Sequence, residues 1–178
     1  MSLKSQKSFL FLRHGETIAN AADIIAGSMD SPLTENGYAQ AETAAQILAK
    51  HEIASIWCSP LSRARETAEA TQRLTQAPLF ELAGLAERDW GAWEGEPRTI
   101  LRRDETPPNG EGPLEFRARI WEALDQITGP FPVLIVAHSG TAREIHAALS
   151  PEPFERLGNA VPIEWRQENG HWNCTKLS

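Results

Sequence analysis

The stretch "SFLFLRHGET", residues 8–17, decides how the chain folds and where it acts. Its four consecutive apolar residues, Phe9 to Leu12, predict a buried strand, because strands of a parallel sheet are covered on both faces. A second apolar run, "FPVLIVAH" at residues 131–138, also ends in a histidine. Ligands of open α/β sheets bind beyond the carboxyl ends of the strands. If the two strands are parallel neighbours, His14 and His138 therefore lie side by side at a ligand site.

Short apolar runs and longer helical patterns alternate along the rest of the chain. This alternation predicts an α/β fold with a largely parallel sheet and helices on both faces. We expect one domain over residues 1–178, with the irregular Gly- and Pro-rich segment 84–112 as a cover over the active site. The other expected elements are a helix from Thr34 to about Lys50, a strand at 55–58, a helix at about 61–74, a helix with Phe116, Ile120, Leu124 and Ile127 on one stripe, a helix at 140–149, and a hairpin around Asn169-Gly170.

Composition limits the classes of partner. The 178 residues carry a formal net charge of −7, which argues against a generally basic, nucleic-acid-binding surface. No apolar run approaches the roughly 20 residues of a membrane span, and the polar start "MSLKSQKS" does not resemble a signal peptide, so we expect a cytoplasmic protein without a membrane partner. Two cysteines, Cys58 and Cys174, make no disulfide framework. Any anion site must be a local cluster of cations.

Such a cluster is predicted from three strand ends. Arg13 and His14 follow the first strand, His138 follows the second, and Arg63 lies in the first turn of the helix after "CSP", where anions are favoured. Two guanidinium groups suit the oxygens of a phosphoryl group. A neutral imidazole among them can attack phosphorus and carry the phosphoryl group covalently, with a carboxylic acid at the pocket mouth to protonate the leaving group. We expect Gly15 to leave room for the substrate.

Other phosphoryl-transfer chemistries fit less well. A cysteine phosphatase has five residues between its cysteine and arginine, whereas Cys58 and Arg63 are separated by four, and Cys58 lies inside an apolar run. The chain has no G-x-x-x-x-G-K-[ST] loop for a nucleotide. A metal ion between His14, His138 and a carboxylate would be repelled by the flanking arginines.

Five segments resemble, in order, the motifs of the histidine phosphatase superfamily, phosphoglycerate-mutase-like branch. They are "LRHGET" (12–17), "AGSMDSPLTENG" (26–37), "SPLSRARETA" (59–68), "LAERDWGAWEG" (85–95) and "VAHSGTAR" (136–143). The resemblance implies a three-layer αβα sandwich and a metal-independent phosphomonoester hydrolase without an organic cofactor. It implies that His14 is the phosphohistidine nucleophile and Glu87 the proton donor, chosen over Asp89, Glu94 and Glu96. It also implies a substrate-binding set of Arg13, Asn20, Gly27, Arg63, His138 and Ser139, in which Arg13, Arg63 and His138 are also catalytic.

Two departures from the family's mutases favour a phosphatase. The mutases usually carry Trp and Ser or Thr where this chain has Ala19 and Ala26, and their segment between the glutamate and the second histidine is much longer. The segment "PPNGEGPLEFRAR" (107–119) resembles that of small phosphatases, including α-ribazole phosphatases, with Gly112 and Glu115 in place of the usual Ser and Asp.

Several alternatives stay open at this point. The chain is either a phosphatase for a small phosphorylated metabolite, a phosphoglycerate mutase-type enzyme, or a catalytically weak module that binds phospho-ligands. Arg98, Arg102 and Arg103 form either an ordinary polar face or a site for a second substrate anion. The sequence does not identify the physiological substrate or the oligomeric state.

Overall fold

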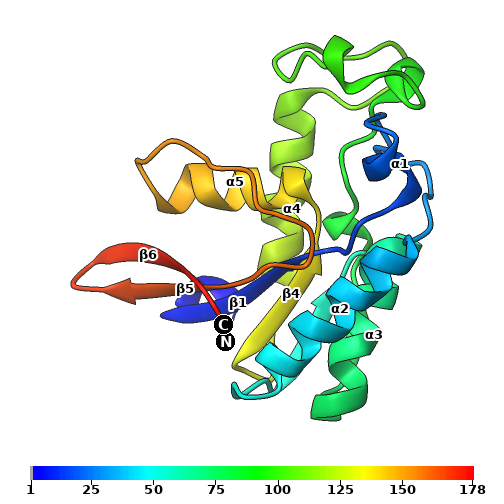
Figure 1. Cartoon of the computed structure of the whole chain (residues 1–178). Helices are drawn as coiled ribbons and strands as arrows, with labels where there is room; N and C mark the ends of the chain where they lie inside the picture. Colours follow the sequence, from blue (N-terminus) through cyan, green and yellow to red (C-terminus); the bar gives the residue numbers. More distant parts are fainter. Residues whose placement is uncertain (1) are drawn as a thin grey trace.

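A six-stranded sheet runs through the centre of the protein in the computed structural model, which describes residues 2–178 (Figure 1). The strand order is β3-β2-β4-β1-β5-β6. The four strands from β3 to β1 are parallel, while β5 and β6 are antiparallel to their neighbours. The strands are β1 (Ser8–Arg13), β2 (Ser55–Cys58), β3 (Leu79–Glu81), β4 (Val133–Ala137), β5 (Pro162–Glu168) and β6 (His171–Lys176).

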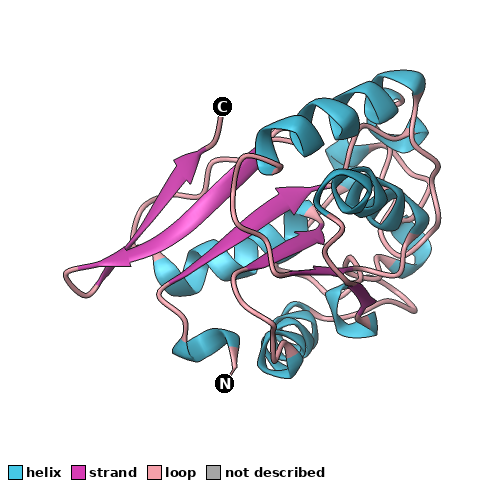
Figure 2. Ribbon diagram, turned by 90° about the horizontal axis from the view of Figure 1, so that it is seen from below, coloured by secondary structure: helices cyan, strands magenta, loops and turns pink. Residues whose placement is uncertain are grey.

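Helices cover both faces of this sheet (Figure 2). They are α1 (Ile18–Ala21), α2 (Glu35–Leu48), α3 (Ser62–Thr75), α4 (Pro113–Gln126) and α5 (Ser139–Leu149). All the helices and strands expected from the sequence are confirmed, and the hairpin forms β5 and β6. The short elements β3 and α1 were not predicted, because three or four residues are too few to carry a periodic pattern.

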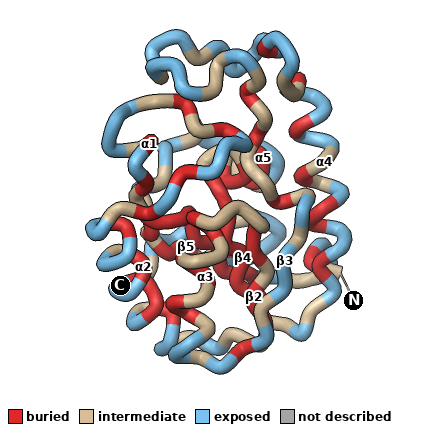
Figure 3. The backbone as a smooth tube through the Cα atoms, turned by 90° about the vertical axis from the view of Figure 1, so that its right-hand side faces the viewer, coloured by how far each residue is buried: buried red, intermediate tan, exposed pale blue. Residues whose placement is uncertain are grey.

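The alternating side chains of β1 contribute to two separate hydrophobic cores. Phe9 and Phe11 belong to a cluster formed with α4 and α5, whereas Leu10 and Leu12 belong to a cluster formed with α2 and α3. Successive residues of a strand point to opposite faces of its sheet, which explains this division. The predicted three-layer αβα architecture is therefore confirmed. Figure 3 shows the resulting distribution, with buried backbone concentrated in the central strands.

The segment 84–112 lies across the carboxyl-end side of the sheet (Figure 1). It contains no α-helix or strand, as the sequence predicted, but short 3-10 helices at Gly91–Trp93 and Arg98–Ile100, and it begins in a third at Ala83–Leu85. Arg88 organises it from within: its buried guanidinium donates to the carbonyls of Glu111, Arg103 and Glu105 at 2.7–2.9 Å.

None of the helices between residues 2 and 178 is long and apolar enough to span a membrane. Both cysteines are free, with Cys58 buried in β2 and Cys174 exposed in β6. Burial raises the pKa of the Cys58 thiol to about 12. Since the thiolate is the nucleophilic form, this cysteine is unsuited to phosphoryl transfer.

Candidate active site

The register of the sheet brings the two predicted histidines together. Arg13 of β1 pairs with Ala137 of β4, so the next residues along the two parallel strands are His14 and His138. Their ring centroids lie 5.2 Å apart, and both rings are buried. The strand-end pattern in the sequence therefore predicted this juxtaposition correctly.

His14 is held with one ring nitrogen fixed and the other unbound. Its Nδ1 lies 2.7 Å from the carbonyl oxygen of Gly15, which only accepts hydrogen bonds, so Nδ1 carries the proton and Nε2 carries a lone pair. Burial, together with the charges of Arg63 and Arg13, lowers the pKa of His14 well below its ordinary value. The imidazole is therefore neutral, which is the state that a nucleophile requires.

The orientation of His138 depends on Ser59, a residue that the sequence reasoning did not single out. His138 Nε2 lies 2.7 Å from Ser59 Oγ, and this hydroxyl oxygen accepts a hydrogen bond from the backbone N–H of Leu61 at 3.3 Å. The hydroxyl proton is then available to His138 Nε2, which favours a proton on Nδ1. That Nδ1 is buried and lacks a protein partner. The signal for Ser59 was present in the sequence, as the first residue of "SPLSRA".

Arg63 enters the site from the first turn of α3 and is almost completely buried. Its guanidinium donates to the carbonyl oxygens of Gly27 at 2.6 Å and Met29 at 3.0 Å. Burial lowers the pKa of this arginine. Two of its donors are thus occupied by one loop, and the side chain lines a cavity together with His14.

Glu94 holds the loop that orients Arg63. Its carboxylate accepts hydrogen bonds from the backbone N–H groups of Ser28, Met29 and Trp90 at 2.6–3.0 Å. Gly27 has a φ of +56°, and a Cβ on it would come within 2.1 Å of Glu94 Oε1. This position therefore requires glycine for both its backbone angle and its contact with Glu94.

Arg13 completes the cationic part of the site from the end of β1. One guanidinium nitrogen donates to the Leu157 carbonyl at 2.7 Å, while the buried Nε lacks a protein partner. Burial first, and then the charge of Arg156, lowers the pKa of Arg13 to about 10.

Glu87 is placed against the start of α5. Its Oε2 accepts from the backbone N–H of Gly140 at 3.0 Å, and its Oε1 accepts from the backbone N–H of Arg88 at 2.9 Å. A Cβ on Gly140 would come within 2.1 Å of Glu87 Oε1, so glycine at this position makes room for the carboxylate. The neighbouring carboxylates have other contacts: Asp89 accepts from the backbone N–H of Gly91, and Glu94 holds the loop near Arg63. Only Glu87 of these three lines the cavity with His14.

The expectation that Gly15 leaves room for the substrate is wrong, because Gly15 packs against α2. A Cβ on Gly15 would come within 2.4 Å of the Gly37 carbonyl oxygen, and a Cβ on Gly37 within 2.0 Å of the Glu16 carbonyl oxygen. The two glycines therefore permit close packing between the His14 loop and α2. The function of Gly15 is to let the backbone that carries the histidine lie against this helix.

Arg13, His14, Arg63 and Glu87 line a cavity of about 60 Å³, whereas the fully buried His138 is not among its lining residues. Of the residues expected to bind substrate, it is lined by Arg13, Asn20, Gly27, Arg63 and Ser139, together with His14 and Glu87. The Asn20 side-chain oxygen accepts from Thr17 N at 3.2 Å and from Asn159 Nδ2 at 3.0 Å. Among residues 2–178, no group of three or more His, Cys, Asp or Glu side chains is arranged to hold a metal ion.

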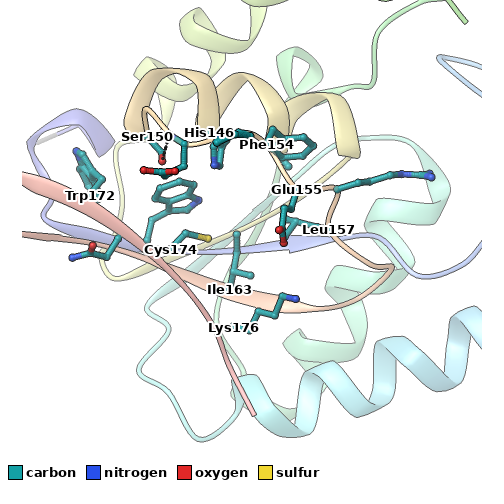
Figure 4. Close-up of a pocket in the computed structure, with 15 residues that line it drawn as sticks. His146, Ser150, Phe154, Glu155, Leu157, Ile163, Trp172, Cys174 and Lys176 are labelled. Carbon is teal, nitrogen blue, oxygen red and sulfur yellow. Dashed lines mark hydrogen bonds between the residues drawn. The ribbon is translucent and has the colours of Figure 1, made fainter.

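A larger cavity, of about 490 Å³, lies apart from this site between α5 and the β5–β6 hairpin (Figure 4). His146, Phe154 and Trp172 are among its lining residues. It contains neither of the paired histidines, and the two cavities share only Arg156 as a lining residue. His14, Arg13 and Arg63 thus come together at the smaller of these two cavities.

The family model described as "Histidine phosphatase superfamily (branch 1)" matches residues 9–177. The chain belongs to the histidine phosphatase superfamily. It is 31% identical over 183 residues to the adenosylcobalamin/alpha-ribazole phosphatase of Salmonella typhimurium, covering 93% of this chain and 88% of the relative. It is 30% identical over 195 residues to the glucosyl-3-phosphoglycerate phosphatase of Mycobacterium tuberculosis, covering 93% and 86%.

A solved structure named mycobacterial hydrolase 1 superposes with a TM-score of 0.80 at 26% identity, covering 95% of this chain and 96% of that one. The resemblance inferred from the five motifs is thereby confirmed. Like its phosphatase relatives in the histidine phosphatase superfamily, the chain is a phosphoric monoester hydrolase.

Proposed function

We propose that this histidine phosphatase hydrolyses a small phosphorylated metabolite through a covalent phosphohistidine at His14. The observation that carries the proposal is the state of that imidazole: neutral, with Nδ1 donating to Gly15 and with Nε2 unbound in a cavity lined by Arg13 and Arg63. A free imidazole lone pair beside two guanidinium groups is suited to attack on a phosphoryl group.

In the first step, His14 Nε2 attacks phosphorus. The N–P bond forms as the bond between phosphorus and the ester oxygen breaks, and the protonated Glu87 carboxyl gives its proton to the departing alkoxide. Arg13 and Arg63 stabilise the charge on the three equatorial oxygens, and His138 Nδ1–H donates to one of them. The hydrogen bond from His14 Nδ1 to the Gly15 carbonyl stabilises the positive charge that the ring gains.

In the second step, water attacks phosphorus. Glu87, now a carboxylate, takes a proton from this water as its oxygen bonds to phosphorus and the N–P bond breaks. Inorganic phosphate leaves, and both His14 and Glu87 return to their starting protonation states. Asn20, Gly27 and Ser139 complete the wall around the phosphoryl group.

The substrate belongs to the class of small phosphate esters rather than nucleic acids or lipids. The cavity around His14 is small, and the chain carries net negative charge, which disfavours a polyanionic partner. The named relatives act on chemically different small phosphates, so their names do not select one compound for this chain. The proposal includes a cytoplasmic location, where such metabolites and free cysteines both occur.

The proposal is tested by phosphate release from a panel of phosphate monoesters in the presence of EDTA. Wild type, His14→Ala and the matched control His171→Ala are compared, since His171 is exposed on β6. We expect release by wild type and the control, and none by His14→Ala. Retained activity in His14→Ala would contradict the nucleophile. A labelled phosphoryl group that returns to an isomeric product would indicate a mutase, and binding without turnover would indicate a binding module.

A further inference from the structure

Four arginines surround the entrance of the cavity that contains His14. Arg98 and Arg156 line this cavity, and Arg103 and Arg143 line an adjoining one of about 80 Å³ that shares Glu87, Arg98 and Ser139 with it. We call Arg98, Arg103, Arg143 and Arg156 the entrance arginines. They come from three separate parts of the chain: the 84–112 segment, α5 and the loop that follows α5. The fold therefore gathers them at one place.

The carboxylates of Asp23, Glu87 and Glu144 lie near the four entrance arginines and compensate part of this charge. Arg98 lies 3.5 Å from the carboxylate of Asp23, which is 75% exposed. Within residues 2–178, the other three entrance arginines form no ion pair, although Arg143 stacks on Phe154 with its guanidinium carbon 4.4 Å from the ring centroid. Glu144 is near this group but already pairs with Arg117 at 2.7 Å.

The neighbours of Arg156 are themselves mostly cations. Burial lowers the pKa of Arg156, and the charges of Arg98 and Arg103 lower it further. Arg156 in turn exerts the largest charge effect that lowers the pKa of Arg13. Partly buried like charges destabilise one another unless a counter-charge is bound. In a chain with 24 acidic and 17 basic residues, this local excess is not a result of overall composition.

One phosphoryl group does not balance this cluster. The transferred group is expected to lie between Arg13, Arg63 and the two histidines. Arg98 and Arg156 line the same cavity and also a neighbouring one of about 300 Å³ that does not include His14 or Arg63 among its lining residues. We infer that the substrate carries a second anionic group, a carboxylate or a second phosphate, which Arg98 and Arg156 bind at the cavity entrance. This inference rests on the proposed function, because it assumes that the ester phosphate occupies the His14 end.

The same geometry separates the three arginines that the sequence left ambiguous. Arg102 is exposed, and its guanidinium is directed to the carbonyls of Thr99 and Ile100 at 3.3–3.4 Å. It does not line the cavity that contains His14 or the adjoining one, whereas Arg98 lines both. Arg102 thus belongs to the ordinary polar face, and it provides a matched control for the arginine substitutions.

Three esters of the same carbon length test the inference. Ethyl phosphate has a neutral tail, phosphoglycolate ends in a carboxylate, and ethylene glycol bisphosphate ends in a second phosphate. The corresponding three-carbon esters place the second anionic group farther from the ester phosphate. We measure kcat/KM for each ester with wild type, Arg98→Gln, Arg156→Gln and Arg102→Gln. We expect wild type to prefer at least one anionic tail by roughly 10-fold or more, since guanidinium groups bind carboxylate and phosphate through paired, charge-assisted hydrogen bonds.

The readout is the ratio of kcat/KM between the anionic and the neutral ester. Arg98→Gln and Arg156→Gln should each lower this ratio by about 10-fold, while Arg102→Gln keeps the wild-type ratio. The ester whose preference falls shows whether the second group is a carboxylate or a phosphate. An absent preference in wild type, or a ratio that neither arginine substitution changes, would overturn the inference and leave the phosphatase proposal standing.

A binding measurement keeps the inference testable without turnover. Calorimetry on His14→Ala gives the Kd of each of the three compounds. At least one compound with an anionic tail should bind about 10-fold more tightly than ethyl phosphate, and Arg156→Gln in the same background should abolish this difference. If wild type releases phosphate from none of the esters while this preference holds, the proposed hydrolysis fails and the second-anion site stands. If neither holds, both fail.

Discussion

At the scale of single residues, two hydrogen bonds determine which nitrogen of each histidine stays without a protein partner. The Gly15 carbonyl fixes the proton of His14 on Nδ1 and so leaves a lone pair on Nε2, as the proposed nucleophile requires. Ser59 takes the Nε2 side of His138 and leaves its Nδ1 without a protein partner. The two rings thus differ in which nitrogen lacks a protein partner, although both are buried histidines at the ends of adjacent strands.

Glu87→Gln replaces the carboxyl group of the proposed proton donor by an amide of the same size. We expect kcat to fall by about 10²–10⁴-fold, the usual contribution of general acid–base catalysis. The loss should be larger for alkyl esters than for aryl esters, because an alkoxide is the poorer leaving group and needs the proton more. Steady-state kinetics on both ester types, with the exposed Glu96→Gln as control, measure this difference. Equal losses for both types would contradict a role as proton donor.

Ser59→Ala removes the hydroxyl that favours the Nδ1–H form of His138. We expect kcat/KM to fall by roughly 10-fold, because the proposed hydrogen bond from His138 Nδ1–H to the charged phosphoryl group is weakened. Imidazole ¹⁵N chemical shifts report the tautomer directly, and Nδ1 of His138 should be protonated in wild type and less so in the variant. Ser59→Thr, which keeps a hydroxyl, should restore both properties. A His138 tautomer that is the same in wild type and Ser59→Ala would disprove this role of Ser59.

At the scale of secondary-structure elements, the apolar runs and helical stripes of the sequence were sufficient for the main strands and helices. The strands at Phe9–Leu12 and within 131–138 were predicted because fully buried strands leave continuous apolar runs. The placement of Arg63 in the first turn of α3 followed from the strand–helix boundary at Ser59-Pro60. The short β3 and α1 carry no such pattern, and their formation depends on tertiary contacts with β2 and with the loop around Leu33.

Contacts between elements were the part that a linear pattern could not supply. The need for glycine at position 140 arises from Glu87, which is 53 residues away in the chain. Arg156 lies in an irregular loop and has no local signal, yet it lines the same cavity as His14. Ser59 was visible only as part of a motif. Positions of this kind depend on how distant segments pack, which a single sequence does not record.

Gly140→Ala tests the contact between α5 and the Glu87 segment. Alanine is favoured over glycine inside a helix by up to about 1 kcal/mol, but its Cβ would come within 2.9 Å of the Phe116 ring, so we expect a net loss of stability. The same Cβ should displace the Glu87 carboxylate and lower kcat by at least about 10-fold. Thermal unfolding and kinetics measure the two effects separately. In a Glu87→Gln background the same substitution should cost much less activity, because the two changes act on one contact. Strictly additive losses would indicate that Gly140 acts independently of Glu87.

At the scale of the whole molecule, folding buries two neutral histidines in a cationic environment. Burial and neighbouring arginines lower the pKa of both His14 and His138 well below the ordinary value of 6.5. The unfolded chain binds protons at these positions below pH 6.5, and the folded chain does not. The free energy of unfolding should therefore decrease as the pH falls through 6.5 and continue to decrease down to the lowered pKa values of the folded protein.

Below about pH 6.5, the two histidines together should lower the free energy of unfolding by about 2–3 kcal/mol per pH unit, since each contributes up to about 1.4 kcal/mol per unit. Urea unfolding at about pH 7.5 and about pH 5.5 measures the change, and carboxylate effects cancel on comparison with a His14→Asn, His138→Asn variant. That variant should show a weaker pH dependence, whereas the exposed His171→Asn should match wild type. An undiminished dependence in the double variant would exclude the two histidines as its source.

The most direct measurement is detection of the phosphoenzyme. Wild type and Glu87→Gln are mixed with a hydrolysable ester, quenched rapidly in base, which preserves phosphohistidine, and digested for peptide mass spectrometry. The mechanism predicts one phosphoryl group on the peptide that contains His14, located on that residue. Absence of the adduct in both proteins while phosphate is released, or its location on another residue, would contradict covalent catalysis by His14.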